Sequence, residues 1–129
     1  MLSGDKLETW DPEGKSKREI KEYSKGNFFG IYPVMLKRLA LRCKYGELKY
    51  GDTRGWRYPR PTSTYLDSAM RHLVEYEVGS NSEDHLAAAI WNIMAMMFNE
   101  EEARDFVDIA SRKEKNGTYS YFAKREPKF

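Results

Sequence analysis

The chain has 129 residues, of which 33% are charged and 40% are apolar, and its net charge is only +2. A length of this order suits one domain, because two independent cores need more chain. The longest nearly uncharged apolar run, residues 86–98, is shorter than the ~20 residues that cross a bilayer. No basic and then apolar leader follows Met1, and the single cysteine, Cys43, cannot form an internal disulfide. We therefore expect one cytoplasmic domain over residues 1–129, with no membrane attachment.

The first thirty residues contain two turn signals and little apolar periodicity, so they predict an irregular arm. Pro33 then stands where a proline is tolerated, at the first turn of a helix. Apolar residues recur at helical spacing through residues 34–48, and Gly51 ends the pattern. The sequence therefore predicts a first helix that begins at Pro33 and ends near Gly51.

Two further helices follow a loop at residues 51–62, which holds Trp56 among three arginines. Thr62, Ser63 or Thr64 can cap a helix that ends near Gly79. Ser82 can cap the next helix, with acidic residues in its first turn and a body at residues 86–97 that is apolar nearly all round. Such an apolar helix belongs in the centre of a bundle or at an oligomer interface.

A fourth helix is predicted from Asn99, because three glutamates follow it in the manner of a helix N-terminus, and Gly117 would end this helix. Residues 118–129 form an aromatic and basic tail, in which residues 118–123 could make a short strand. The expected fold is therefore all-α: a four-helix bundle with a helical core at about 32–116, an irregular N-terminal arm and a C-terminal tail.

Charged and imidazole groups gather on the second and third predicted helices. Asp67 and Arg71 are four residues apart, which is the spacing of an ion pair on a solvated helix face. Carboxylates that face each other across two helices of a bundle can instead hold magnesium, which activates water. Spacing alone does not select among the candidate ligands, which are Asp67, Glu75, Glu83, Asp84 and Glu47.

Two other side chains have both a structural and a functional interpretation. Asn92 lies on an otherwise apolar helix, so its amide needs a partner in the protein or a ligand. Trp56 either packs its loop against the bundle or binds a nucleotide together with Lys49. In the second case the Lys49 charge would contact phosphate and the Trp56 ring would stack on the base.

The order of these features resembles the dATP/dGTP diphosphohydrolase family of phages, a branch of the MazG-like all-α pyrophosphohydrolases. The residues that carry the resemblance are Lys49-Tyr50-Gly51, Trp56, Tyr65 to Leu73 and Asp84 to Asn92. The resemblance implies a homodimer or homotetramer that uses Mg²⁺ or Mn²⁺ to hydrolyse a purine deoxynucleoside triphosphate to the monophosphate and pyrophosphate. In some phages that reaction supplies dGMP for modified-purine synthesis.

The resemblance also implies roles for individual residues. Metal ligands would be Asp67 and Asp84, assisted by Glu83 or His85, and Glu47 is a further candidate from the sequence. Catalysis would rest on Asp67, Asp84, His72 and Arg71. Substrate would be held by Lys49, Tyr50, Trp56, Arg71, His85 and Asn92.

Two other functions remain open from the sequence. A non-catalytic nucleotide-binding or regulatory bundle would bind nucleotide with metal and release no product. A basic nucleic-acid-binding protein would show an affinity that falls steeply with salt. The nearly balanced charge disfavours this last function, so we expect no stable nucleic-acid complex.

Overall fold

The computed structural model describes residues 25–52 and 55–113. The chain forms two compact units, one of residues 1–32 with 126–129 and one of residues 33–125. Within the described part of the first unit, Asn27 caps a short 3-10 helix, η2 (Phe28–Gly30), by accepting a hydrogen bond from the Phe29 amide. The predicted N-terminal arm up to residue 24 and the tail from residue 114 lie outside the described residues.

The described part of the second unit is helical and contains no strand. Its α-helices are α3 (Pro33–Tyr50), α4 (Thr62–Glu77) and α5 (His85–Glu102). The short 3-10 helix η3 (Gly55–Arg57) lies between α3 and α4, and η4 (Arg104–Phe106) and η5 (Ala110–Arg112) follow α5. The all-α class is therefore confirmed. The predicted ends of α3 and α4 are confirmed as well, because Gly51 and Gly79 both adopt a positive φ that glycine accepts without strain.

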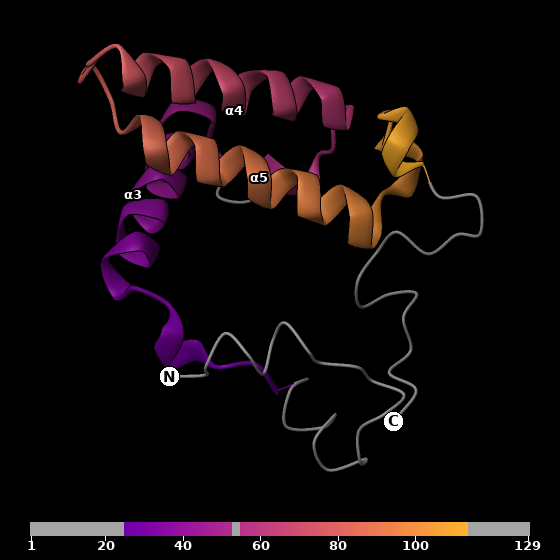
Figure 1. Ribbon diagram of the computed structural model, residues 1–129, viewed down its shortest axis with the longest axis horizontal. Helices are drawn as coiled ribbons and strands as arrows, with labels where there is room; N and C mark the ends of the chain where they lie inside the picture. Colours follow the sequence, from indigo (N-terminus) through magenta and orange to yellow (C-terminus); the bar gives the residue numbers. More distant parts are fainter. Residues whose placement is uncertain (1–24, 53–54, 114–129) are drawn as a thin grey trace. The chain divides into compact units, whose positions relative to one another are not determined.

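Helix α5 is the centre of this unit and contacts both α3 and α4 (Figure 1). It runs antiparallel to α4, since Asn99 near its end bonds Thr62 and His85 at its start bonds His72. Ala88 and Ala95 of α5 are fully buried, and their small side chains leave room for close packing around this helix. No residue of α3 is buried, so the core of the described residues lies mainly between α4 and α5.

The expected fourth helix is not confirmed. Helix α5 continues through Asn99 to Glu102, and the residues beyond it form the 3-10 turns η4 and η5 up to the end of the described segment. Asn99 is fully buried and donates to the Arg60 carbonyl at 2.8 Å and to the Thr62 hydroxyl at 3.0 Å. The prediction that Asn99 caps a helix was wrong, because its amide donates to Arg60 in the loop before α4 and to Thr62, the first residue of α4.

Both predicted caps of α4 and α5 are replaced by other groups. Asp84, rather than Ser82, is the N-cap of α5, and its carboxylate accepts the Ala87 amide at 3.0 Å. The first turn of α4 receives no side-chain hydrogen bond from its own N-cap, Pro61. Asp108 instead accepts from the Ser63 amide at 2.8 Å and from the Ser63 hydroxyl at 2.5 Å. A carboxylate from 45 residues away therefore satisfies this helix end.

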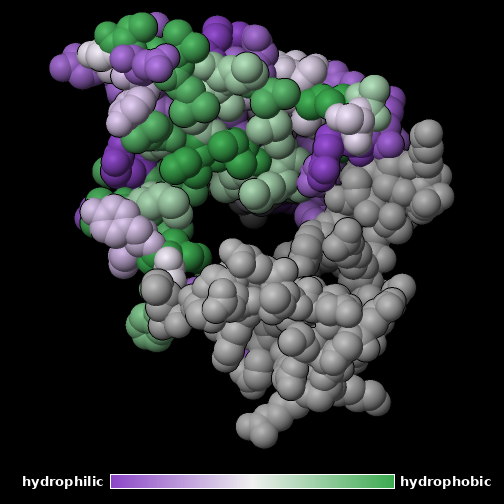
Figure 2. Space-filling model, in the orientation of Figure 1, coloured by the Kyte–Doolittle hydropathy of each residue, from purple (hydrophilic) through white to green (hydrophobic). Residues whose placement is uncertain are grey.

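Apolar side chains gather over α5 and the adjoining part of α3 on the face shown in Figure 2. No helix among the described residues has both the length and the apolar character needed to cross a membrane.

Candidate functional site

Two arginines of α3 meet two acidic residues at the start of α5. Arg38 donates to both carboxylate oxygens of Asp84, from Nε at 2.8 Å and from a terminal nitrogen at 2.7 Å. Arg42, one helical turn further along α3, donates to the carboxylate of Glu83 and stacks over the Tyr45 ring at 5.0 Å. These pairs attach α3 to the segment between α4 and α5.

Two imidazoles face each other beside these ion pairs. The Nδ1 atoms of His72, on α4, and His85, the first residue of α5, lie 3.0 Å apart. The second nitrogen of His85, Nε2, lies 3.0 Å from the hydroxyl of Ser80. His85 is only 5% exposed, so its ring is held inside the protein while His72 is partly exposed.

The protonation states at this site follow from its hydrogen bonds and its burial. The Arg38 hydrogen bond, helped by the Ala87 amide, lowers the pKa of Asp84 from 3.8 to about 2. The Arg42 hydrogen bond likewise lowers the pKa of Glu83. Desolvation lowers the pKa of His72, and the nearby positive charges of Arg42 and Arg71 act in the same direction, against Glu83. At neutral pH the carboxylates are therefore charged and His72 is neutral, as metal ligands need to be.

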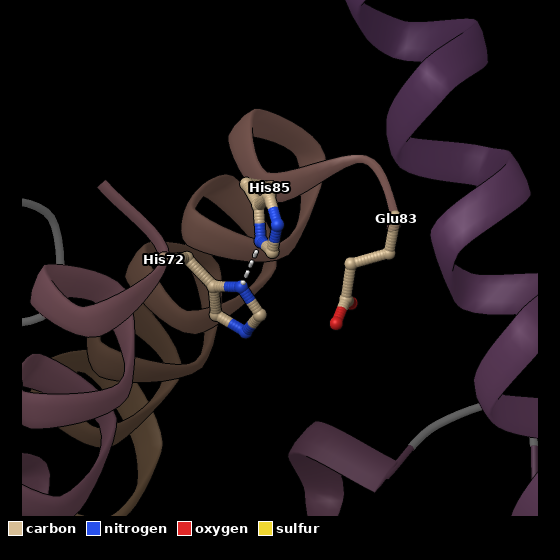
Figure 3. A group of neighbouring side chains, drawn as sticks. All are labelled: His72, Glu83 and His85. Atoms are coloured by element: carbon tan, nitrogen blue, oxygen red, sulfur yellow. Dashed lines mark hydrogen bonds between the residues drawn. The ribbon is translucent and has the colours of Figure 1, made fainter. Parts of the chain in front are cut away.

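One group of side chains has the arrangement of a metal site. His72, Glu83 and His85 each offer a ligand atom within 4.8 Å of the other two, and they converge from α4, the connection and α5 (Figure 3). Among the residues that the structure describes, no other group of three histidine, cysteine, aspartate or glutamate side chains is as close. Two imidazole nitrogens and one carboxylate oxygen suit a borderline transition-metal ion better than they suit magnesium, which prefers oxygen.

A comparison with models of protein families identifies the family of the chain. The family model described as dATP/dGTP diphosphohydrolase, N-terminal, matches residues 15–109, which is most of the chain and includes the three α-helices of the described residues. The chain belongs to this family. The family is one of hydrolases, in agreement with the resemblance seen in the sequence. Searches of curated proteins and of solved structures found no significant match.

The four carboxylates implied as metal ligands occupy separate surroundings within this family member. Asp67 is paired with Arg71 on the exposed face of α4, where the two side chains are 69% and 66% exposed. Glu47 is paired with Lys44 on α3 at 3.2 Å. Asp84 is held by Arg38, so only Glu83 of the four joins the group with the histidines. The structure therefore does not assemble an all-oxygen cage from the described residues of one chain.

The residues implied as substrate contacts are also spread along the helices. Lys49 lies over the rings of Tyr45 and Tyr50 near the end of α3, where hydrogen bonding to Tyr50 raises the pKa of Lys49. Trp56 contacts the Phe98 ring edge-on, with centroids 5.2 Å apart. Phe98 follows His85 by 13 residues, which is about 20 Å along an α-helix. Trp56 therefore packs its loop against α5 far from the histidine pair.

Asn92 finds its partner within its own helix, since its amide donates to the Ala88 carbonyl at 2.8 Å. It is only 7% exposed and follows His85 by seven residues, about 10 Å along α5. In this structure its amide is satisfied by the helix, as the structural interpretation requires.

Sequence reasoning missed three residues of the site, namely Arg38, Arg42 and Ser80. The two arginines are four residues apart on the first helix, as an ion-pairing or anion-binding pair would be, and this spacing was a signal that could have found them. Nothing in the sequence marks Ser80, because its contact with His85 depends on how the connection between the helices folds. Cys43 stays outside the site, and burial raises the pKa of its thiol, which disfavours the nucleophilic thiolate.

Proposed function

We propose that this chain hydrolyses a purine deoxynucleoside triphosphate, dATP or dGTP, to the monophosphate and pyrophosphate with the help of a divalent metal ion. Membership of the dATP/dGTP diphosphohydrolase family supports the substrate class. The observation that carries the proposal is the group formed by His72, Glu83 and His85, with Arg42 paired to its Glu83 and Arg38 paired to the adjoining Asp84. Cations beside a candidate metal group are what a polyphosphate requires.

In the proposed reaction, water attacks the α-phosphorus and the bond from that phosphorus to the oxygen bridging the β-phosphorus breaks. Pyrophosphate leaves, and the water oxygen stays on the monophosphate. A bound divalent ion would supply charge neutralisation and an acidified water, and His72, Glu83 and His85 are the residues that would hold it. The resemblance implies Mg²⁺ or Mn²⁺ as the ion, whereas the two imidazole ligands favour a transition-metal ion over Mg²⁺.

The cationic side chains would neutralise the charge that develops on the phosphate oxygens. Arg42 is paired with Glu83 of the metal group, and Arg71 precedes His72 on α4, so both cations lie near the group. Lys49, further along α3, would hold the distal phosphates or the sugar together with Tyr50. The catalytic roles of Asp67 and Asp84, and the base or sugar contacts of Trp56 and Asn92, stay proposals.

We also propose that the chain assembles as a homodimer or homotetramer. A single copy exposes large apolar side chains on α3, α4 and α5, and clustered apolar side chains on a protein surface commonly mark an interface. On α4 and α5 these are Leu66, Met70, Leu73, Val74, Tyr76, Ile93 and Met97. Light scattering after gel filtration would measure the mass, and Met70→Glu is expected to shift it toward the monomer. A monomeric mass for the unaltered chain would contradict this assembly.

The biological setting follows from the reaction. A cytoplasmic enzyme that converts dGTP to dGMP would supply that monophosphate for modified-purine synthesis during a phage infection. This role depends on dGTP being a substrate.

A product assay tests the enzyme directly. The purified chain is incubated with each of the eight common nucleoside triphosphates, with and without Mg²⁺ or Mn²⁺, and products are separated by chromatography. We expect pyrophosphate and a purine deoxynucleoside monophosphate only when metal is present. Affinity for nucleotide with no product would instead establish a non-catalytic nucleotide-binding bundle. Tight, strongly salt-dependent binding to nucleic acid without turnover would establish a nucleic-acid-binding protein.

Two variants locate the reaction. Arg42→Ala removes a guanidinium from beside the metal group, so kcat/KM is expected to fall by about 10²- to 10³-fold. Lys37→Ala is the matched control, because Lys37 is an exposed cation on the same helix that takes no part in the site. Equal activities of the two variants would place the reaction elsewhere in the chain.

A further inference from the structure

The histidine pair is unusual because two like atoms face each other at hydrogen-bonding distance. The Nδ1 atoms of His72 and His85 are 3.0 Å apart, and the rings are tilted by 41° with centroids 5.3 Å apart. In a hydrogen bond between two imidazole nitrogens, one nitrogen carries the proton and the other accepts it with its lone pair. The lone pairs of both nitrogens can be directed at a metal ion when that proton is absent.

The spacing of the two nitrogens is close to that of a metal site. A tetrahedral ion with metal to nitrogen distances of about 2.0–2.1 Å places two ligand nitrogens about 3.3 Å apart. The observed 3.0 Å therefore needs to widen by only about 0.3 Å. A Glu83 oxygen lies within 4.8 Å of a ligand nitrogen of each histidine and has further to move, and its side chain is 40% exposed.

Groups outside the three residues already hold two of them in place. Ser80 lies 3.0 Å from the Nε2 atom of His85, which orients the ring and leaves Nδ1 directed at His72. Arg42 donates to the Glu83 carboxylate and positions it beside the pair. Metal-binding histidines and carboxylates are commonly oriented by such outer hydrogen bonds.

We propose that His72 Nδ1, His85 Nδ1 and a carboxylate oxygen of Glu83 bind a borderline divalent transition-metal ion, of the class of Co²⁺ and Zn²⁺, in preference to Mg²⁺. Imidazole donors favour such ions, whereas magnesium keeps oxygen ligands and bound waters. Three protein ligands leave at least one position for water or a phosphate oxygen, as in catalytic zinc sites. Metal binding stands independently of the proposed hydrolysis, and only its use in catalysis rests on that function.

Cobalt is the probe for the test, because tetrahedral Co²⁺ absorbs visible light strongly and octahedral Co²⁺ does so weakly. The full chain is titrated with CoCl₂ while the visible spectrum and the heat of binding are recorded. We expect one ion per chain with an intense visible band that persists in a hundredfold excess of Mg²⁺. No stoichiometric binding, or displacement by that magnesium, would overturn the proposal.

Variants assign the ion to this site. His72→Gln and Glu83→Gln each remove one ligand and are expected to lower the Co²⁺ affinity by more than tenfold. Ser80→Ala leaves all three ligands and is expected to cost about 10- to 100-fold through the orientation of His85. Glu77→Gln, an exposed glutamate at the end of α4 outside the group, is the control with unchanged affinity. Unchanged affinity in both His72→Gln and Glu83→Gln would overturn the assignment.

Circular dichroism of the metal-free variants shows whether each one folds, and a ligand variant that is folded but does not bind supports the site. The results also separate this inference from the proposed function. Cobalt binding at these residues without hydrolysis of any nucleotide would uphold the metal site and refute the enzyme. Hydrolysis with Mg²⁺ alone and no cobalt site would support the enzyme and refute the proposed metal site.

Discussion

Arg38 on α3 and Asp84 at the start of α5 form a two-pronged ion pair, with hydrogen bonds of 2.8 and 2.7 Å across 46 residues of sequence. The same aspartate is the N-cap of α5 and accepts the Ala87 amide. One carboxylate therefore caps the N-terminus of α5 and also links it to α3. Its two roles can be separated by mutation.

Asp84→Ala is expected to lower the free energy of unfolding by about 1–2 kcal/mol, mostly through loss of the N-cap. Asp84→Asn keeps a good capping side chain and loses only the charge, and the pair is 45% and 35% exposed, so it should cost at most about 1 kcal/mol. Urea denaturation of the three proteins measures both effects. Equal losses in the two variants would show that the ion pair, and not the cap, carries the stability.

The lowered pKa of Asp84 predicts a loss of stability in acid. The pKa falls from 3.8 to about 2 on folding, so the unfolded chain takes up a proton at higher pH than the folded one. The stabilisation is thus fully present above about pH 4 and is lost as pH falls toward 2. Urea unfolding between pH 7 and pH 2 should show the gap between wild type and Asp84→Asn shrinking only below about pH 4. A constant gap over this range would refute the assignment.

The cap that Asp108 provides to α4 predicts a long-range effect on that helix. Asp108→Ala leaves the Ser63 amide and hydroxyl without their acceptor, so the melting temperature should fall. Hydrogen exchange should be faster in the first turn of α4. Asp105→Ala is the control, since Asp105 is an exposed carboxylate in η4 just before Asp108 and is expected to change neither measurement. Equal effects of the two substitutions would argue against the cap.

Loss of the buried side-chain amide of Asn99 is expected to lower the free energy of unfolding. Asn99→Leu keeps a similar volume but removes the donor to the Arg60 carbonyl and the Thr62 hydroxyl, which would then lie unsatisfied near the core. The expected loss is about 1–3 kcal/mol in the free energy of unfolding. In the wild type, the Oδ1 atom of Asn99 is buried without a hydrogen-bond partner among the described residues. Asn99→Leu removes this atom, which offsets part of the expected loss of stability. A variant as stable as wild type would mean that this gain outweighs the lost bonds.

The candidate site could be predicted only in part from the sequence. The sequence placed Glu83, Asp84 and His85 together at the start of one helix and named His72 on the helix before it, but it did not bring the two sets together. It offered both an ion pair with Arg71 and a metal-binding role for Asp67, and only the structure shows the ion pair, with Glu83 rather than Asp67 beside the histidines. Those outcomes depend on the rotation of α4 against α5, which positions every side chain relative to the other helix.

The sequence by itself determined the all-α class, the start of α3 at Pro33 and the ends of α3 and α4 at Gly51 and Gly79. Each of these follows from the backbone preferences of one or two residues, so neighbours in sequence are sufficient. The tertiary structure alone decided that Asn99 lies inside α5, that Asp84 and Asp108 cap the helices, and that Arg38 and Arg42 face the acidic turn. A polar side chain accepts whichever partner the packing of distant helices presents to it, and local sequence does not specify that partner.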